Sequence, residues 1–225
     1  MDKKQGKLIV IDGIDGSGKT TQIELLKQYL ASQGVSLQVS LQVEVIDFPR
    51  YEDNLYGKLI KRYLEGEFGG IENVNPYLMA LAFAGDRFLA KPLIESWLQS
   101  GKLVIANRYV SASKAHLGAN LSEEKREEFM EWIDKLEYQT NGLLKPDLNI
   151  LLDIDPFIGQ QNALAKNQPD IHEEDKSHLE KARKIYLELS QTEENWKIVE
   201  CMEKGEMKLK EAIHKLIVEI FSSIL

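Results

Sequence analysis

The pattern of apolar and polar side chains divides the sequence into alternating strands and helices. Residues 7–12, KLIVID, form a short apolar run rich in β-branched residues, which is typical of a buried strand. Comparable runs at residues 102–107, 148–155 and 196–200 predict three more strands. Residues 35–47 alternate between apolar and mostly polar residues, and this period of two is the clearest strand signal in the chain. Five strands are therefore predicted.

Helical periodicity fills the segments between these strands. Ile23, Leu26 and Leu30 recur at helical spacing, and Gly34 is a suitable residue to end that helix. Pro92, inside the longest apolar segment, predicts a kink or a break. Helices are predicted at residues 19–34, 55–66, 75–101, 121–139, 178–190 and 207–224, the fourth with Ser122 as its N-cap. Strands alternating with helices favour an α/β fold in which helices cover both faces of a parallel sheet, within one domain spanning residues 1–225.

The unit VSLQ occurs twice in tandem at residues 35–42. Four is an even number, so a duplication leaves every side chain on its original face of a strand. Two interpretations stay open: a coincidence within a long amphipathic strand, or a small duplication that lengthens the strand or extends the sheet edge.

The composition limits the partners and the cellular compartment that are expected for the protein. The net charge of -8 argues against a nucleic acid or an anionic membrane as the main partner. Cys201 is the single cysteine, so no internal disulfide forms and a reducing compartment such as the cytoplasm is expected. The apolar run near the N-terminus is too short for a signal peptide, and no run approaches the roughly 18 apolar residues of a membrane span.

A phosphate-binding loop follows the first predicted strand. Gly13, Gly18, Lys19 and Thr20 fit the spacing G-x-x-x-x-G-K-[ST], between a strand and a helix. Glycines let successive N–H groups point at one anion, the lysine reaches the β- and γ-phosphates, and the Thr20 hydroxyl is placed to ligate Mg²⁺. The residues predicted to bind the nucleoside triphosphate are Gly13, Asp15, Gly16, Ser17, Gly18, Lys19, Thr20 and Thr21.

The rest of the sequence favours a small phosphotransferase among the proteins with such a loop. It has neither the N-K-x-D base reader of guanine-specific switches nor the L-S-G-G-Q signature of transport ATPases. Arg50 and Arg108 follow the second and third strands, and Arg87 lies on the long helix. Ligands of open parallel sheets bind at the carboxyl ends of the strands, where arginines can neutralise two anionic substrates.

An ordered set of short segments carries a family resemblance. IDGIDGSGKTTQ, FPRY, FAGDR, NRYVSAS and LLDIDP, in this order and at these spacings, resemble the thymidylate kinase family. The resemblance implies a P-loop three-layer fold with a five-stranded core, transfer of the γ-phosphate of ATP to dTMP in dTTP synthesis, and a homodimer. ATP with Mg²⁺, and dTMP, are the implied ligands.

The resemblance also implies roles for particular residues. Asp15 contacts the 3′-hydroxyl of the deoxyribose, and Arg50 holds the dTMP phosphate beside Phe48 and Pro49, which line the nucleotide site. Phe83 stacks on the thymine ring. Arg87, one helical turn later, bonds to the thymine O4 atom, and Arg108 bridges the acceptor phosphate and the transferred group.

The sequence departs from the family pattern after the third strand. Asn107 stands where the family usually has an aspartate, so a charge expected near Mg²⁺ is missing. Ser113 is in a position to reach the base. His116 replaces the ring that helps to exclude a ribose 2′-hydroxyl, which leaves discrimination between sugars open.

A third departure concerns positive charge around the transferred phosphate. Some family members place a catalytic arginine in the phosphate loop, where this chain has Gly16, and others supply arginines from a lid. The lid is expected at about residues 157–176 and contains no arginine. Lys166 is the best basic candidate, with His172 second and Arg183, on the next helix, a further possibility. Lys19, Arg108, Asp15 and Lys166 are thus the predicted catalytic residues.

Two alternatives to a dTMP kinase stay open from the sequence. One is a kinase of dUMP, another nucleotide or a deoxynucleoside, favoured by Asn107 and His116. The other is a nucleotide-binding protein with weakened catalysis, favoured by Asn107 and the arginine-free lid.

Overall fold

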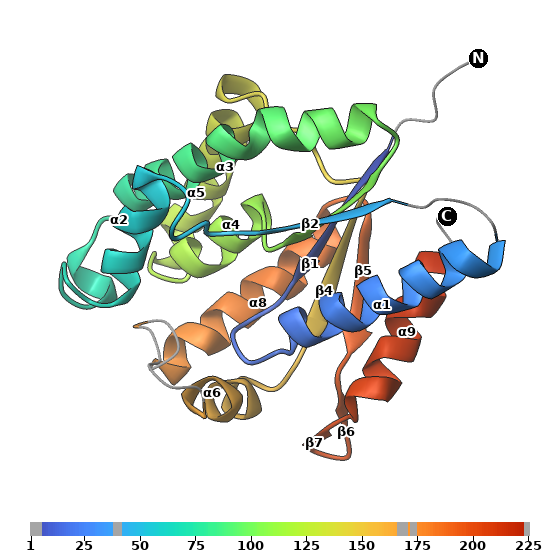
Figure 1. Ribbon diagram of the computed structural model, residues 1–225. Coiled ribbons are helices and arrows are strands. Elements are labelled where there is room, and N and C mark those ends of the chain that lie inside the picture. The colour runs from blue at the N-terminus through green and yellow to red at the C-terminus, as the bar shows by residue number, and fades with distance from the viewer. Residues whose placement is uncertain (1–5, 38–41, 166–170, 172–174, 223–225) are drawn as a thin grey trace.

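A five-stranded parallel sheet organises the chain. The computed structural model describes residues 6–37, 42–165, 171 and 175–222. The strands are β1 (Lys7–Asp12), β2 (Val43–Asp47), β3 (Leu103–Asn107), β4 (Leu148–Asp153) and β5 (Trp196–Glu200), in the spatial order β2-β3-β1-β4-β5. Every pairing is parallel, so all carboxyl ends lie at one edge, and β1 occupies the centre (Figure 1).

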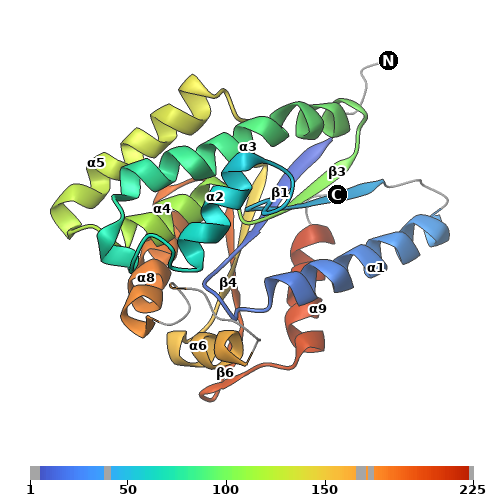
Figure 2. The same cartoon turned by 60° about the vertical axis from the view of Figure 1, so that its left-hand side comes forward.

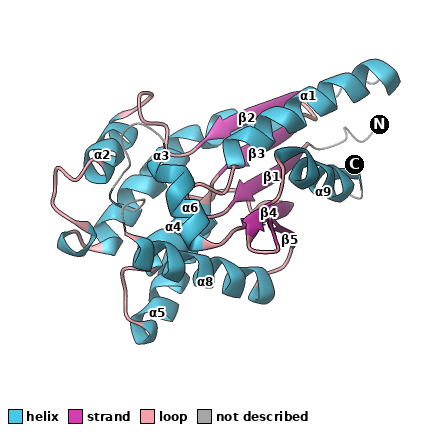
Figure 3. Ribbon diagram, turned by 90° about the horizontal axis from the view of Figure 1, so that it is seen from below, coloured by secondary structure: helices cyan, strands magenta, loops and turns pink. Residues whose placement is uncertain are grey.

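Helices cover both faces of the sheet (Figures 1 and 2). On one face lie α1 (Lys19–Leu37) and α9 (Lys210–Ser222). The other face carries α2 (Leu55–Leu64), α3 (Pro76–Gln99), α4 (Val110–Gly118), α5 (Glu123–Asp134) and α8 (Lys176–Thr192), while α6 (Pro156–Leu164) lies near the start of α1. The view from below places the sheet between the two helical layers (Figure 3). The α/β, three-layer prediction is confirmed.

The alternation of side chains along β1 explains the two-sided cover. Ile9 and Ile11 pack with α1 and α9, whereas Leu8 and Val10 pack with the helices of the opposite face. All four side chains are at most 1% exposed. A continuous apolar run is therefore what a central strand, buried on both faces, requires.

The strand predicted at residues 35–47 begins later than expected. Helix α1 continues through Gly34 to Leu37, and β2 starts at Val43. The prediction is wrong for residues 35–37, because a glycine weakens a helix by only about 1 kcal/mol and a few alternating residues do not exclude one. The VSLQ tandem therefore begins inside a helix, and its residues 38–41 lie outside the described part of the chain.

Other differences are local. Helix α3 runs unbroken through Pro92, and the Ser122 side chain makes no capping hydrogen bond at the start of α5. Helix α4 was not predicted, because it is buried on nearly all sides and has no polar stripe. A hairpin of β6 (Met202–Glu203) and β7 (Glu206–Met207) was also missed, as were a 3₁₀ turn (Ile71–Asn73) and a π-helical turn, η2 (Lys135–Thr140). Among the described residues, no helix is both long enough and apolar enough to cross a membrane.

Candidate functional site

The loop between β1 and α1 has the shape that its glycines predict. Gly13, Gly16 and Gly18 have φ angles of 144°, 75° and 88°, which residues with a Cβ atom rarely adopt. The ammonium of Lys19 donates to the carbonyl oxygens of Gly13 at 3.0 Å and Ile14 at 2.9 Å. A curled backbone, a helix N-terminus and a buried ammonium thus meet at one point, and this combination favours phosphate binding.

Gly16 is enclosed by helix α6. A Cβ atom on Gly16 would lie 2.0 Å from the carbonyl oxygen of Gly159, and the Gly16 carbonyl accepts a hydrogen bond from Asn162 Nδ2 at 3.1 Å. Glycine at this position lets α6 dock against the loop. Packing is therefore a physical reason why this loop carries no arginine there.

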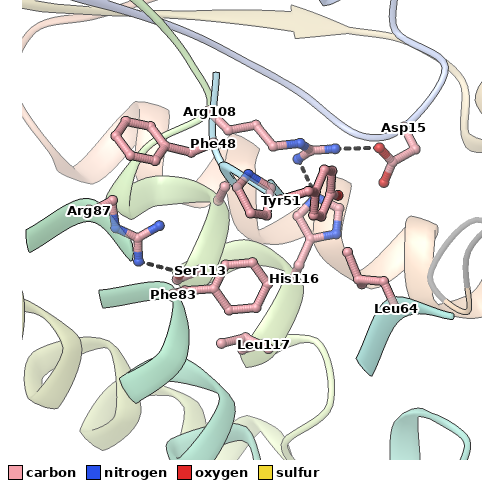
Figure 4. Close-up of a pocket in the computed structure, with 12 residues that line it drawn as sticks. Asp15, Phe48, Tyr51, Leu64, Phe83, Arg87, Arg108, Ser113, His116 and Leu117 are labelled. Carbon is pink, nitrogen blue, oxygen red and sulfur yellow. Dashed lines mark hydrogen bonds and ion pairs between the residues drawn. The ribbon is translucent and has the colours of Figure 1, made fainter. Parts of the chain in front are cut away.

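Two cavities open at the carboxyl ends of the strands. The first is lined by the predicted substrate residues Asp15, Phe48, Pro49, Phe83, Arg87, Arg108, Ser113 and His116 (Figure 4). The second is lined by the predicted loop residues Asp15, Gly16, Gly18, Lys19, Thr20 and Thr21. Gly13 and Ser17 are buried and shape the loop from within. Asp15, Phe48, Pro49, Tyr51 and Arg108 line both cavities, so the cavities adjoin.

Arg108 stands at the boundary between the cavities. It follows β3 with a φ of 65°, a left-handed conformation that is uncommon outside glycine and recurs at functional sites. Its Nη2 atom donates to Asp15, and its Nη1 atom donates to His116 Nε2 at 2.8 Å and to the Tyr186 hydroxyl at 3.3 Å. Figure 4 shows the guanidinium between Asp15 and His116. Contacts from three elements thus fix this side chain.

Neighbouring acids keep Arg108 charged. Burial acts to lower the pKa of Arg108, but the carboxylates of Asp15 and Asp12 outweigh it, and the pKa is raised. Tyr186 donates to Asp12 Oδ1 at 2.6 Å, and burial followed by Asp12 raises the pKa of Tyr186 well above its ordinary value. Ser111 donates to the other Asp12 oxygen at 2.6 Å. The site therefore holds a permanent cation beside a protonated phenol.

Arg87 forms a buried ion pair with Glu137 on η2. The two side chains are only 2% and 1% exposed. Both Nε, at 3.0 Å, and Nη2 of Arg87 donate to Glu137 Oε1. Nη1 donates to the Tyr109 carbonyl at 3.2 Å, and Nη2 to Ser113 Oγ at 2.7 Å. Glu137 thereby fixes the guanidinium at the wall of the first cavity.

Arg50 has a different environment from the other predicted substrate residues. Its Nε atom pairs with Asp86 Oδ1 at 3.0 Å, its Nη2 atom donates to the Asp86 carbonyl at 2.8 Å, and its amide donates to Asp86 Oδ2 at 2.9 Å. Neither of the two cavities is lined by Arg50. Of its guanidinium nitrogens, Nη1 lies farthest from a partner, 3.9 Å from Asp53.

An oxygen-rich corner adjoins the phosphate loop. Asp47 and Asn107 end the neighbouring strands β2 and β3 and line the second cavity together with Thr20. The Oδ1 atom of Asn107 is buried and has no hydrogen-bond partner among the residues that the structure describes. A hydroxyl, a carboxylate and an amide carbonyl are oxygen donors suited to Mg²⁺, which accepts few protein ligands and keeps several waters. The residues present therefore fit that ion.

Of the three basic candidates in and after the lid region, the structure describes Arg183. Lys166 and His172 lie outside the described residues. Arg183 donates from Nε and Nη2 to the two carboxylate oxygens of Asp153, at 2.6 and 2.9 Å, and lines neither cavity. The Asp153 carboxylate, acting mainly through this hydrogen bond, raises the pKa of Arg183.

Several site residues were missed by sequence reasoning. Glu137, Tyr186 and His178 act through residues far away along the chain, so no local motif points to them. Tyr51 directly follows the FPR segment, and its place there was an available signal. Asn162 and Met207 line the second cavity from α6 and β7.

A phosphate loop on the central strand of a parallel sheet, with an adjoining cavity that contains two arginines, defines a P-loop protein built for two neighbouring ligands. The profile of the thymidylate kinase family matches residues 11–213. The chain belongs to the thymidylate kinase family.

Individual relatives agree with this assignment. Thymidylate kinase of Mycobacterium tuberculosis is 30% identical over 189 residues, covering 81% of this chain and 85% of that protein. A probable thymidylate kinase of Methanosphaera stadtmanae is 34% identical over 189 residues, covering 83% and 85%. A solved thymidylate kinase structure from Candida albicans superposes with a TM-score of 0.71 over 97% of this chain and 92% of that one; at 23% identity, this likeness supports the fold.

Proposed function

We propose that the protein transfers the γ-phosphoryl group of ATP to dTMP, giving ADP and dTDP for dTTP synthesis. One observation carries the proposal. The phosphate-loop cavity and the arginine-containing cavity share a wall, and Arg108 and Asp15 stand on it. Two phosphates bound on either side of that wall would both lie beside Arg108.

The first cavity accepts the dTMP base and sugar. A guanidinium has five N–H donors, and the described residues take four of those of Arg87 through Glu137, Tyr109 and Ser113. The hydrogen that remains, on Nη1, suits a carbonyl such as thymine O4 and rejects an amino group. Phe83 stacks on the base, and Asp15 binds the 3′-hydroxyl.

Lys19 and Arg108 supply the positive charge that the phosphoryl transfer needs. A phosphate oxygen of dTMP attacks the γ-phosphorus of ATP, the bond from that phosphorus to the β–γ bridging oxygen breaks, and ADP leaves. The attacking oxygen is already ionised at neutral pH, so alignment and charge neutralisation replace a general base. Lys19 neutralises the β- and γ-phosphates, and Arg108 bridges donor and acceptor.

Mg²⁺, when bound, neutralises phosphate charge and orients the triphosphate. Thr20 would be its first protein ligand, and Asp47 and Asn107 would hold it directly or through water.

Two further site roles belong to the proposal. Arg50 binds the dTMP phosphate through Nη1 while Nε and Nη2 stay on Asp86. Residues 157–176 form a lid over the nucleotides within a single domain of residues 1–225, and Lys166 supplies positive charge from it.

The protein works in the cytoplasm as a homodimer in this proposal. An apolar surface on α2 and α3 supports the dimer. It consists of Leu55, Tyr56, Leu59, Leu78, Leu81, Phe88, Leu89 and Leu93, each between 38% and 83% exposed. Many exposed apolar side chains on two packed helices are typical of protein interfaces.

Sedimentation velocity tests the dimer. The wild type is expected to sediment as a dimer at micromolar concentration and Leu89→Glu as a monomer. Leu209→Glu is the matched control, since Leu209 is 77% exposed but lies outside the apolar surface. A monomeric wild type contradicts the dimer.

An ADP-release assay over a panel of nucleoside monophosphates, with ATP and Mg²⁺, tests the reaction. dTMP is expected to give the highest kcat/KM, with dUMP lower. A preference for dUMP or another acceptor replaces the substrate assignment. Binding of ATP and dTMP without ADP release favours a nucleotide-binding protein instead.

A further inference from the structure

Arg108 begins a chain of side-chain hydrogen bonds that leads out of the cavity. Its Nη1 atom lies 2.8 Å from His116 Nε2, His116 Nδ1 lies 3.4 Å from His178 Nε2, and His178 Nδ1 lies 3.0 Å from Asn120 Oδ1. His116 and His178 are 6% and 3% exposed. His178 and Asn120 line neither cavity, and this chain of hydrogen bonds connects them to the site through His116.

The arginine sets the direction of every bond in this chain. A guanidinium only donates, so His116 Nε2 must accept and its proton must sit on Nδ1. His116 Nδ1 then donates to His178 Nε2, which places the His178 proton on Nδ1. That proton in turn needs an acceptor, and Asn120 Oδ1 supplies it. In this arrangement each ring donates from Nδ1 and accepts at Nε2.

If every hydrogen bond ran in the opposite direction, two donors would meet at Arg108. With the Asn120 amide turned round, its Nδ2 atom would donate to His178 Nδ1, and the proton of each ring would move to Nε2. The Nε2 proton of His116 would then face the Nη1 protons of Arg108 across 2.8 Å. Two donors in contact repel, so one arrangement of the four side chains satisfies every bond.

This chain ties Arg108 to the packing between two helices. His116 lies on α4, Asn120 just beyond its end, and His178 in the first turn of α8, where its amide is capped by Asp175 at 3.1 Å. The His116 ring also lies 5.6 Å from the His178 ring and 5.8 Å from the Tyr186 ring, centre to centre. Within this chain of bonds, His178 is the residue that sets the proton and orientation of His116.

We propose that His178, acting through His116, is a positioning residue that holds Arg108 at the boundary between the two cavities. This inference rests on the proposed phosphotransfer. It assigns His116 a task different from contact with the sugar: its Nε2 lone pair orients the arginine that bridges the phosphates. His178 and Asn120 form the outer support.

Steady-state kinetics of His178→Leu and His178→Gln test the proposal. Leucine keeps most of the volume but accepts no hydrogen bond, so kcat is expected to fall about ten-fold, the value of one hydrogen bond near 1.4 kcal/mol. The KM for ATP stays within about two-fold. Glutamine offers an oxygen to His116 Nδ1–H and is expected to recover part of the loss. His214→Gln, a histidine substitution on α9 beside Tyr29, is the matched control and leaves kcat unchanged.

A double-mutant cycle separates positioning from general stability. In an Arg108→Ala background the His178→Leu substitution is expected to have no further effect on kcat, because the side chain that it positions is gone. Independent, multiplicative losses would overturn the proposal, as would an unchanged kcat in a well-folded His178→Leu protein. Asn120→Leu gives the same readout if the His178 variants do not fold. A wild type that does not phosphorylate dTMP rejects the function itself, whereas an active wild type with silent His178 variants rejects only the positioning role.

Discussion

Asn107 and Asp47 end two neighbouring parallel strands, and Asn107 Nδ2 donates to Asp47 Oδ1 over 2.7 Å. Position 107 has an amide where the family usually has a carboxylate, yet a carboxylate stands directly beside it on β2. The hydrogen bond also fixes the amide so that its Oδ1 atom, which has no partner among the described residues, remains for another ligand. The pair thus offers the two oxygen types of a divalent-cation site.

Asp47→Asn is expected to weaken Mg²⁺ binding. Removing the one charge of this pair should raise the Mg²⁺ concentration for half-maximal activity about ten-fold or more, as loss of a supporting carboxylate does in other metal sites. Paramagnetic Mn²⁺ titration in the presence of ATP gives an independent measure of affinity. Asp53→Asn, in the loop after β2 and outside the second cavity, is the control. Equal metal affinity in Asp47→Asn and wild type would remove Asp47 from the metal site.

Lys19→Ala is expected to lower turnover by at least about a thousand-fold without unfolding the protein. The ammonium is the loop's own positive side chain, and the hydrogen bonds described above join it to neighbouring loop atoms. Single-turnover assays measure the loss, and circular dichroism checks the fold. Turnover at the wild-type rate would contradict the assigned site.

Arg87→Ala is expected to raise the KM for dTMP about ten-fold or more, since a hydrogen bond from a charged donor is worth roughly 1.5–3 kcal/mol. The KM for ATP should change little, because Arg87 lines only the first of the two cavities. Arg62→Ala, an exposed arginine paired with Glu67, is the control. Parallel increases in both KM values would place Arg87 outside the base site.

Glu137→Ala is expected to destabilise the protein by about 3–5 kcal/mol, because it leaves the buried guanidinium of Arg87 without its counter-charge. Urea denaturation measures the change. The control is Glu67→Ala, which breaks the exposed pair with Arg62 and should alter stability little. A small effect of Glu137→Ala would show that water reaches Arg87 and replaces the carboxylate.

Gly16→Ala is expected to reduce both stability and ATP affinity. The substitution forces a φ of 75° on alanine and drives its Cβ atom into the Gly159 carbonyl. Gly205→Ala is a close control, since Gly205 has a φ of 84° but no described atom within 4 Å of the point where a Cβ atom would lie. The difference between the two variants, measured by urea denaturation, isolates the clash with α6. Equal destabilisation by both variants would mean that α6 moves away from residue 16 without a loss of stability.

Local patterns predicted those parts of the fold that local physics determines. The apolar run at residues 7–12 placed β1 correctly, because a strand buried on both faces needs a continuous apolar sequence. The run at residues 196–200 placed β5 correctly as well, although β5 is an edge strand in which only Val199 is buried. Local patterns missed α4, since a helix surrounded by protein shows no amphipathic period. They also started β2 too early, because helix α1 propagated through a glycine.

The residues of the candidate site also fall into two groups: those that a local motif predicts and those that it does not. Lys19 and Arg108, which lie within motifs, line the second cavity, and their catalytic roles stay predictions. Glu137 and His178 could not be found from the sequence, because each matters only through a partner dozens of residues away. Arg50 satisfied the strand-end pattern, but the nearby Asp86 determines where its side chain lies.

Helix α3 contributes residues both to the first cavity and to the apolar surface. Phe83 and Arg87 on this helix line the first cavity, whereas Phe88 and Leu89 belong to the apolar surface. A second copy of the chain and a bound nucleotide would then contact the same helix from different sides. Binding of dTMP and dimer strength would then be thermodynamically linked, each changing the other by the same factor. The dimer dissociation constant, measured with and without dTMP, tests this linkage.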